Sequence, residues 1–225
     1  KTKSLRLNKS KTTYTAYQYN PSSRSMTCDN DYELTTIYEE YDATGHIIQK
    51  REAFQNPVSI IYGYNNSLPI ATIENANIKN EVFYTSFEDD PNAIKIEHAK
   101  TGNKVYNKNY SINLSSFKPG SYVLTYWKTN DNGLTWIKQT HSLIINSSVK
   151  SYSVECPFSC YIDELRVIPP DAIINTTSYV PGVGIISETD HNGITIYYEY
   201  DAFGRLITIR DNDRNKLKSY RYINH

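Results

Sequence analysis

Apolar and polar residues alternate along most of this chain, in short runs separated by Asn, Asp, Gly and Pro. Examples are the segments SIIYGY, SYVLTYWKT, LTWIKQTHSLIIN, CYIDELRVI and RLITIRD. A period of two places successive side chains on opposite faces of a strand, and the three-to-four spacing of an amphipathic helix is almost absent. The pattern therefore predicts an all-β chain of short antiparallel strands joined by tight turns.

Two segments of the chain resemble each other closely. Residues 37–52 read IYEEYDATGHIIQKRE, and residues 196–211 read IYYEYDAFGRLITIRD. Each predicts a strand, a turn of the form Asp-Ala-x-Gly and a second strand, with Gly45 and Gly204 where a positive φ is needed. Asn192-Gly193 predicts a further hairpin just before the second copy, so residues 187–223 are expected to form a β-meander.

The second copy resembles the YD repeats of Rhs-type and related bacterial surface proteins, most clearly in the run YDAFGRL at residues 200–206. In the first copy Thr44 and His46 stand where those repeats have an aromatic residue and an Arg. The resemblance implies framework hairpins within a large bacterial protein that is secreted or at the cell surface. Neighbouring YD repeats of the parent chain are the expected partners, because an isolated unit exposes both sheet edges.

The segment between the copies has a strand set of its own. Its strongest hairpin is SYVLTYWKT-NDNG-LTWIKQT, which carries both tryptophans of the chain. Short strands with frequent turns predict an antiparallel β-sandwich. We therefore expect N-terminal strands and a first YD-like repeat over residues 1–79, a sandwich over 80–172 and a second YD-repeat meander over 173–225.

Three phrases of the middle segment resemble the jelly-roll carbohydrate-binding modules of bacterial surface proteins and glycan-degrading enzymes. They are FYTSFED at 83–89, IEHAKTGNKVY at 96–106 and CYIDELRVIPPDA at 160–172. The resemblance implies a polysaccharide or glycan as ligand and a structural calcium ion between the first and last strands. Carried over by position, Glu88 and Asp163 would be its side-chain ligands, with backbone oxygens near Gly102 and Asn103 completing the shell. Alternatively, Glu88 and Asp163 are edge residues paired with Lys or Arg.

Aromatic side chains are the natural candidates for sugar contacts, because a ring can stack on the apolar C–H face of a pyranose. Trp136 shares a predicted strand face with Lys138, which makes it the main candidate for an exposed platform. Trp127 and Tyr126 point to opposite faces of their strand, and the alternation does not decide which face builds the core. Further candidates come from the hairpin tip, whose residues are equally explained by turn formation: Asn130 and Asp131.

The charge balance narrows the range of partners. The chain has 24 Lys plus Arg and 24 Asp plus Glu, so its net charge is zero. A nucleic-acid binder or a module for anionic membranes draws its affinity from a basic face, so neither class is expected. No run is long and apolar enough to cross a bilayer or to form a signal peptide, so we expect no membrane insertion. The chain begins without Met, and we expect it to be a piece of a longer protein.

The three cysteines are Cys28, Cys156 and Cys160. The CPFSC pair predicts either a small disulfide loop or two free thiols, and zinc would require further ligands at suitable spacing. Cys28 is expected to be structural.

Sequence motifs of catalysis are absent: there is no Gly-x-Ser-x-Gly, phosphate-binding loop or His-Glu-x-x-His. The adjacent acids Glu39-Glu40 and Asp89-Asp90 would point to opposite faces of a strand, unlike a glycosidase pair. We therefore expect no enzyme, and predict non-catalytic carbohydrate binding by the sandwich. The alternatives are a purely structural spacer or shell segment of an Rhs-like protein, and a protein-binding adhesin segment.

Overall fold

The computed structural model describes residues 2–7, 18–23, 25–27 and 32–223. Every regular element in this part of the chain is a β-strand, and the strands pair antiparallel. The predicted all-β, antiparallel class is therefore confirmed. Among the described residues, no helix has the length and apolar character that a membrane span requires. The chain divides into two compact units, Lys1–Pro57 and Val58–His225.

The first unit contains two small antiparallel groups of strands. β2 (Gln18–Asn20) pairs with β3 (Ser25–Thr27), and the other group has the order β1-β4-β5. Its members are β1 (Thr2–Leu7), β4 (Tyr32–Tyr41) and β5 (Ile47–Glu52). Cys28 lies outside the described residues, so its structural role stays a prediction.

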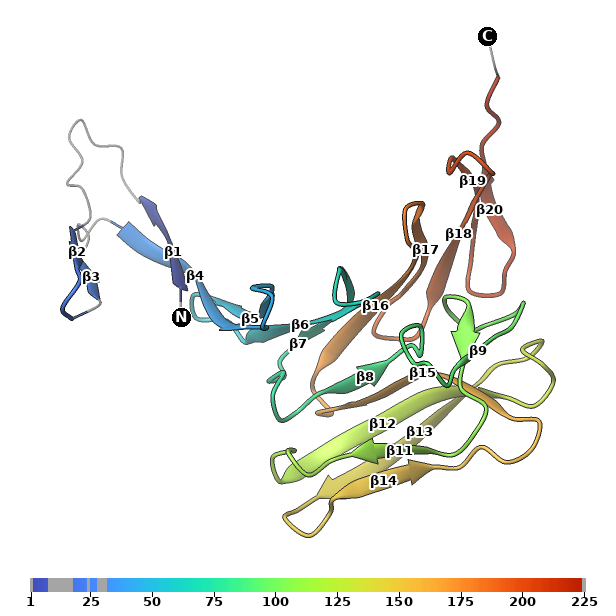
Figure 1. Ribbon diagram of the computed structural model, residues 1–225, viewed down its shortest axis with the longest axis horizontal. Coiled ribbons are helices and arrows are strands. Elements are labelled where there is room, and N and C mark those ends of the chain that lie inside the picture. Colours follow the sequence, from blue (N-terminus) through green and yellow to red (C-terminus); the bar gives the residue numbers. More distant parts are fainter. Residues whose placement is uncertain (1, 8–17, 24, 28–31, 224–225) are drawn as a thin grey trace. The chain divides into compact units, whose positions relative to one another are not determined.

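The second unit is built on a sheet, the repeat sheet, with the strand order β6-β7-β16-β17-β18-β19-β20. These strands are β6 (Pro57–Gly63), β7 (Leu68–Glu74), β16 (Ile173–Val180), β17 (Gly184–Thr189), β18 (Thr195–Tyr200), β19 (Leu206–Arg210) and β20 (Lys216–Ser219). β16 pairs directly with β7, and Ile174 lies opposite Ile73. Figure 1 shows β7 and β16 side by side, although a long segment separates them in the sequence. The sheet therefore continues across residues 75–172, which we call the insert.

The insert forms a second layer with its own strands. Its main sheet has the order β13-β12-β15-β8, and the pairs β11-β14 and β9-β10 complete it. The strands are β8 (Phe83–Thr85), β9 (Ile94–Lys95), β10 (Lys104–Val105), β11 (Tyr110–Asn113), β12 (Gly120–Thr129), β13 (Ile137–Ile145), β14 (Ser151–Val154) and β15 (Tyr161–Ile168). The jelly-roll order of the strands and the three-part division of the chain stay predictions.

Alternation along β12 separates a core face from an outer face. Tyr122, Leu124 and Tyr126 are buried in the core of the insert, whereas Trp127 on the opposite face is only half-buried. The core continues with Phe87, Ile112, Leu114, Ile145, Val154, Ile162, Leu165 and Val167. A disulfide joins Cys156 to Cys160, both of which are buried, so the disulfide alternative holds. Burial of this many large apolar groups supplies the main stabilisation of the insert.

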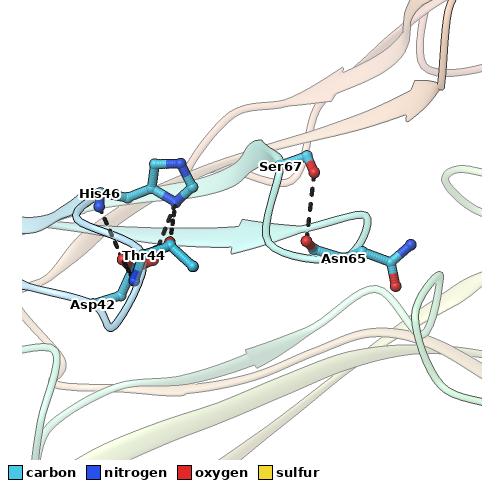
Figure 2. Close-up of polar contacts among 5 residues, drawn as sticks. All are labelled: Asp42, Thr44, His46, Asn65 and Ser67. Carbon is cyan, nitrogen blue, oxygen red and sulfur yellow. Dashed lines mark hydrogen bonds and ion pairs between the residues drawn. The ribbon is translucent and has the colours of Figure 1, made fainter.

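One type of turn recurs through the hairpins of the chain. An Asp carboxylate accepts the backbone N–H groups two and four residues later. Asp42 accepts those of Thr44 and His46, each at 2.9 Å, and Figure 2 shows this turn. Asp190, Asp201 and Asp211 make the same pair of bonds. The fourth residue has a positive φ in each turn, and it is Gly45, Gly193 or Gly204 in three of them. The predicted Asp-Ala-x-Gly turns and the Asn192-Gly193 hairpin are therefore confirmed.

Candidate functional site

A cleft of about 650 Å³ lies between the insert and the last hairpins of the repeat sheet. On the insert side its walls come from the loop before β10, from the end of β12 and from the connection before β13. On the other side they come from β18, β19 and the turn before β20. The lining residues are Glu97, His98, Lys100, Trp127, Gly133, Leu134, Thr135, Trp136, Tyr197, Glu199, Arg210, Asn212, Asp213 and Arg214.

The two tryptophans form the aromatic part of the insert wall. Trp136 is half-buried, and its Nε1 donates to the carbonyl oxygen of His98 at 2.9 Å. Gly133 has a φ of +88°, and a Cβ there would lie 2.3 Å from the same carbonyl oxygen. Only glycine therefore fits this close approach between the hairpin tip and the His98 loop.

The structure corrects the predicted strand around Trp136. β13 begins at Ile137, so Trp136 lies in the connection and does not share a strand face with Lys138. The cause is the turn chemistry of Asp131, whose Oδ1 accepts the backbone N–H of Thr135 at 2.9 Å and widens the hairpin end. Together with the bond to His98, this places the indole against the cleft.

Lys100 lies at the buried side of the cleft, with only 4% of its surface exposed. Its Nζ is 4.1 Å from the centroid of the Trp127 ring and 3.2 Å from Oδ1 of Asn212, to which it donates. Burial, reinforced by the positive charge of Arg214, lowers the pKa of Lys100 to about 8. The ammonium thus has a cation–π contact and one hydrogen-bond acceptor, and no carboxylate of the described residues bonds it directly.

The framework wall contacts the same loop. The hydroxyl of Tyr197 donates to the carbonyl oxygen of Lys100 at 3.0 Å, and the NH2 group of Arg214 donates to the carbonyl oxygen of Ala99 at 2.9 Å. The Arg214 guanidinium lies 3.4 Å from the centroid of the Tyr197 ring. These contacts attach the insert to β18 and to the turn before β20, and they define the shape of the cleft.

Arg214 occupies the position that glycine takes in the other three Asp turns. Its φ is +65°, a region that costs an ordinary residue roughly 1–2 kcal/mol. Its backbone N–H still bonds to the carbonyl oxygen of Asp211, so the turn is the same. At this one turn, a side chain that reaches Ala99 and Tyr197 has replaced the residue that suits the backbone best.

The charges of the cleft balance. Arg210 binds Glu199 through its Nε at 2.6 Å and its NH2 at 3.2 Å, and this pairing lowers the pKa of Glu199. The other charged residues of the lining are two cations, Lys100 and Arg214, and two exposed acids, Glu97 and Asp213. An aromatic surface bordered by such donors and acceptors suits a ligand with both apolar faces and many hydroxyls.

The structure brings some of the sequence candidates together and separates others. Trp127 and Trp136 share the cleft, whereas Tyr126 is 7% exposed and lies in the core on the opposite face of β12. The tip residues Asn130 and Asp131 are exposed and belong to the turn, outside the lining of the cleft. A hydrogen bond from the Thr129 hydroxyl at 2.5 Å, followed by the Thr135 amide, lowers the pKa of Asp131 to about 2.

The proposed calcium ligands lie around one loop. Thr101 N–H donates to Oδ2 of Asp163 at 2.9 Å, and Asn103 N–H donates to Oε1 of Glu88 at 2.8 Å. The loop therefore presents amide hydrogens to both carboxylates, and Lys104 Nζ donates to the carbonyl oxygen of Glu88 at 2.6 Å. This arrangement makes the carboxylates acceptors of backbone bonds. Within the described part of the chain, no group of three His, Cys, Asp or Glu residues has the spacing of a metal site. Calcium stays a prediction.

Burial accounts for the electrostatics of these acids. Asp163 is fully buried, and burial followed by the charge of neighbouring Glu164 raises its pKa well above the usual range. Burial also raises the pKa of Glu88. Gly102 has a φ of +60°, and a Cβ there would overlap the Glu88 carboxylate. The resemblance to carbohydrate-binding modules thus pointed to a loop that both acids contact. The loop has a glycine at position 102 because the Glu88 carboxylate, which accepts backbone N–H groups of the loop, leaves no room for a Cβ there.

Sequence reasoning missed the framework half of the cleft, because residues 173–225 were assigned to scaffolding. The residues overlooked there are Tyr197, Glu199, Arg210, Asn212 and Arg214, and Lys100 of the insert was overlooked as well. One signal was available in the sequence. The run DNDRN at 211–215 repeats the Asp turn but has Arg at the glycine position, and such a departure marks a side chain with another role.

Comparison with protein families agrees with the class of framework seen here. The family model described as RHS Repeat matches residues 183–216, which run from the turn before β17 to the start of β20 and contain three of the Asp turns. The C-terminal hairpins are therefore similar to an RHS repeat. No curated protein matches the chain.

Proposed function

We propose that this chain is a non-catalytic carbohydrate-binding segment of a large exported Rhs-type protein, secreted or at the cell surface. The ligand lies in the cleft between the insert and the repeat sheet. The observation that carries the proposal is the convergence of both tryptophans of the chain on one cleft whose other wall is polar and charged.

Each wall has a distinct part in binding. The half-buried indoles of Trp136 and Trp127 stack on the C–H face of a sugar ring, which is apolar. His98, Asn212 and Glu199 offer hydrogen-bond partners to its hydroxyl groups. Lys100 and Arg214 hold the two walls together, so the site is present before the ligand arrives. Binding at one cleft is weak, and several such segments in a parent protein add avidity.

The test is retention of the protein on a glycan array and in affinity gels that contain soluble polysaccharides. Trp136→Ala is expected to abolish retention. Phe158→Ala is the matched control, because Phe158 is fully exposed in the disulfide loop and does not line the cleft. Absence of retention on every polysaccharide, or equal retention of Trp136→Ala and the wild type, would contradict the proposal.

A second candidate is a purely structural role, in which the insert covers one face of a repeat shell. It is favoured by the contacts of Tyr197 and Arg214 with the Lys100 loop, which fix the insert whether or not a ligand binds. In this case Trp136→Ala lowers the melting temperature and no glycan is found. A protein ligand at the same cleft, as in an adhesin, would appear as retention by a protein and not by a glycan.

The proposal retains a structural calcium ion held by Glu88, Asp163 and a backbone oxygen near Asn103. The support is the burial of two carboxylates on either side of one loop, since a cation stabilises such groups. Added Ca²⁺ is then expected to raise the melting temperature relative to protein in a chelator. An unchanged melting temperature removes calcium from the account and leaves the cleft unaffected.

A further inference from the structure

A lysine and an asparagine meet at the buried side of the cleft, although they lie 112 positions apart in the sequence. Lys100 belongs to the insert, and Asn212 belongs to the turn between β19 and β20. The Nζ of Lys100 donates to Oδ1 of Asn212 at 3.2 Å. Since a carbonyl bond is about 1.2 Å long, Nζ lies no more than about 4.4 Å from the Cγ carbon of the amide. Nζ is therefore within about 1 Å of the distance from which an amine can attack that carbon.

The surroundings of Lys100 favour a neutral, nucleophilic amine. Lys100 is 4% exposed, and its Nζ lies 4.1 Å from the centroid of the Trp127 ring. Burial, followed by the positive charge of Arg214, lowers the pKa of Lys100 to about 8. The charges that oppose this shift are those of Glu164, Asp163 and Asp213. At pH 7 roughly a tenth of the amine is then neutral, compared with fewer than about one in a thousand for an ordinary lysine. Desolvation beside another cation thus activates Lys100 as a nucleophile.

The Asn212 side chain is held at both ends of its amide. Its Oδ1 also accepts the backbone N–H of Thr195, a fully buried residue of β18, at 3.1 Å. Its Nδ2 donates to Oδ1 of Asp213 at 3.3 Å. An N–H that points at the carbonyl oxygen stabilises the negative charge that develops there during attack on Cγ. A carboxylate beside the nitrogen can deliver a proton to the leaving group. A nucleophile, an oxyanion donor and a proton carrier therefore surround one amide.

We propose that Lys100 and Asn212 become joined by a covalent amide bond that ties the insert to the repeat sheet. The lone pair of Nζ forms a bond to Cγ, and the carbonyl electron pair moves to Oδ1 beside the Thr195 N–H. The Asp213 carboxylate takes a proton from Nζ and transfers it to Nδ2. The carbonyl forms again as the bond between Cγ and Nδ2 breaks, and ammonia leaves. One amine and one primary amide give one secondary amide and ammonia, so no oxidant is required.

The bond removes a buried charge and adds a crosslink. A neutral amide replaces an ammonium that no carboxylate of the described residues bonds directly, and burial of such a charge is costly. The crosslink constrains the unfolded chain in the same way as a disulfide. The proposal does not depend on sugar binding. The pH dependence that a free Lys100 amine gives to stability belongs to the chain before this bond forms, and it is measured on protein that retains its full mass.

The test is the intact mass of the purified whole chain after incubation at about pH 8, where about half of the Lys100 amine is neutral. We expect the mass to be lower, by one molecule of ammonia, than the value calculated from the sequence with its disulfide. Trypsin should release residues 96–104 joined to residues 211–214 as one branched peptide, because cleavage after Lys100 is blocked. An unchanged mass, or a loss of ammonia without the branched peptide, would overturn the proposal.

Two variants and a matched control make the assignment specific. Lys100→Arg retains the positive charge but has no amine nucleophile, so it should keep its full mass. Asn212→Ala has no amide carbon to attack and should also keep its full mass, which tests the bond if Lys100→Arg fails to fold. Lys150→Arg, at an exposed lysine outside the cleft, should lose ammonia as the wild type does. Loss of ammonia by Lys100→Arg or by Asn212→Ala would place the reaction elsewhere and contradict the proposal. The branched peptide of the wild type decides the outcome if neither variant folds.

Discussion

The insert and the repeat sheet are both antiparallel β structures, but different interactions hold them together. The insert has a core of large apolar side chains, among them Phe87, Leu124 and Leu165, and a disulfide. The second buried cluster is smaller and joins the repeat sheet to the insert: Ile70, Ala71, Ile73 and Ile174 come from the repeat sheet, and Ala76 and Tyr84 come from the insert. The later hairpins of the repeat sheet depend instead on the repeated Asp turns and on contacts with the insert. The sheet thus behaves as a framework and the insert as a unit with its own core.

This difference explains why function is expected where the two meet. A framework of repeated turns can be extended without change, and an independent core can be inserted between adjacent strands such as β7 and β16. At the contact the repeat departs from its pattern, and Arg214 replaces the glycine of the turn. Arg214 is one of the residues that line the cleft.

The largest expected effect comes from the core of the insert. Leu165→Ala should lower the free energy of unfolding by about 3 kcal/mol, because the side chain is fully buried and leaves a cavity. Leu217→Ala in β20 is the matched control, since Leu217 is exposed and should change stability little. Urea denaturation measures both. Equal effects would contradict the contrast between the two regions.

The next effect comes from the disulfide. Replacing Cys156 and Cys160 by Ser should lower the free energy of unfolding by about 2 kcal/mol, the entropy of closing a short loop. Hydrogen exchange on the same variant should show faster exchange in β14 and β15, next to the bridge, than in β18 and β19. Uniform acceleration over both regions would contradict an independent core.

Lys100 makes the contact between the regions dependent on pH. In the folded protein its pKa is about 8, whereas the unfolded chain has the ordinary value of 10.5. Between these values the unfolded state binds more protons, so this residue makes stability rise with pH. Lys100→Met should therefore be more stable than wild type at pH 7, and the difference should shrink by about 1 kcal/mol per pH unit above pH 8. Chemical denaturation at several pH values measures this difference in stability. A difference that does not vary with pH would contradict the burial of a charged Lys100.

The smallest effect concerns the turns. Gly204→Ala should cost about 1 kcal/mol through its positive φ alone, because a Cβ there would meet only Cγ1 of Val183 at 4.0 Å, an ordinary van der Waals contact. Arg214→Gly relieves the same strain in the equivalent turn but loses the bond to Ala99, so its net effect should be smaller. Thermal denaturation compares the two variants. A larger loss for Arg214→Gly would mean that the contact with the insert outweighs the turn.

Local patterns predicted the strands, the Asp turns and the Asn-Gly hairpins, because alternation and turn chemistry act over a few residues. The pairing of β7 with β16 and the meeting of Lys100 with Asn212 depend on contacts between distant segments, which a single sequence does not encode locally. The two faces of β12 illustrate the same limit. Tyr126 and Trp127 alternate correctly, but only the packing of the second layer decides that Tyr126 is buried.

The most direct measurement is a titration followed by intrinsic tryptophan fluorescence. The chain has two tryptophans, and both line the cleft, so their emission reports on the proposed site alone. The ligand is a soluble oligosaccharide of a glycan that retains the protein. We expect a saturable change in emission for the wild type and no change for Trp136→Ala, in which binding is lost. An oligosaccharide that binds by calorimetry without changing the emission of either tryptophan would contradict binding in the cleft.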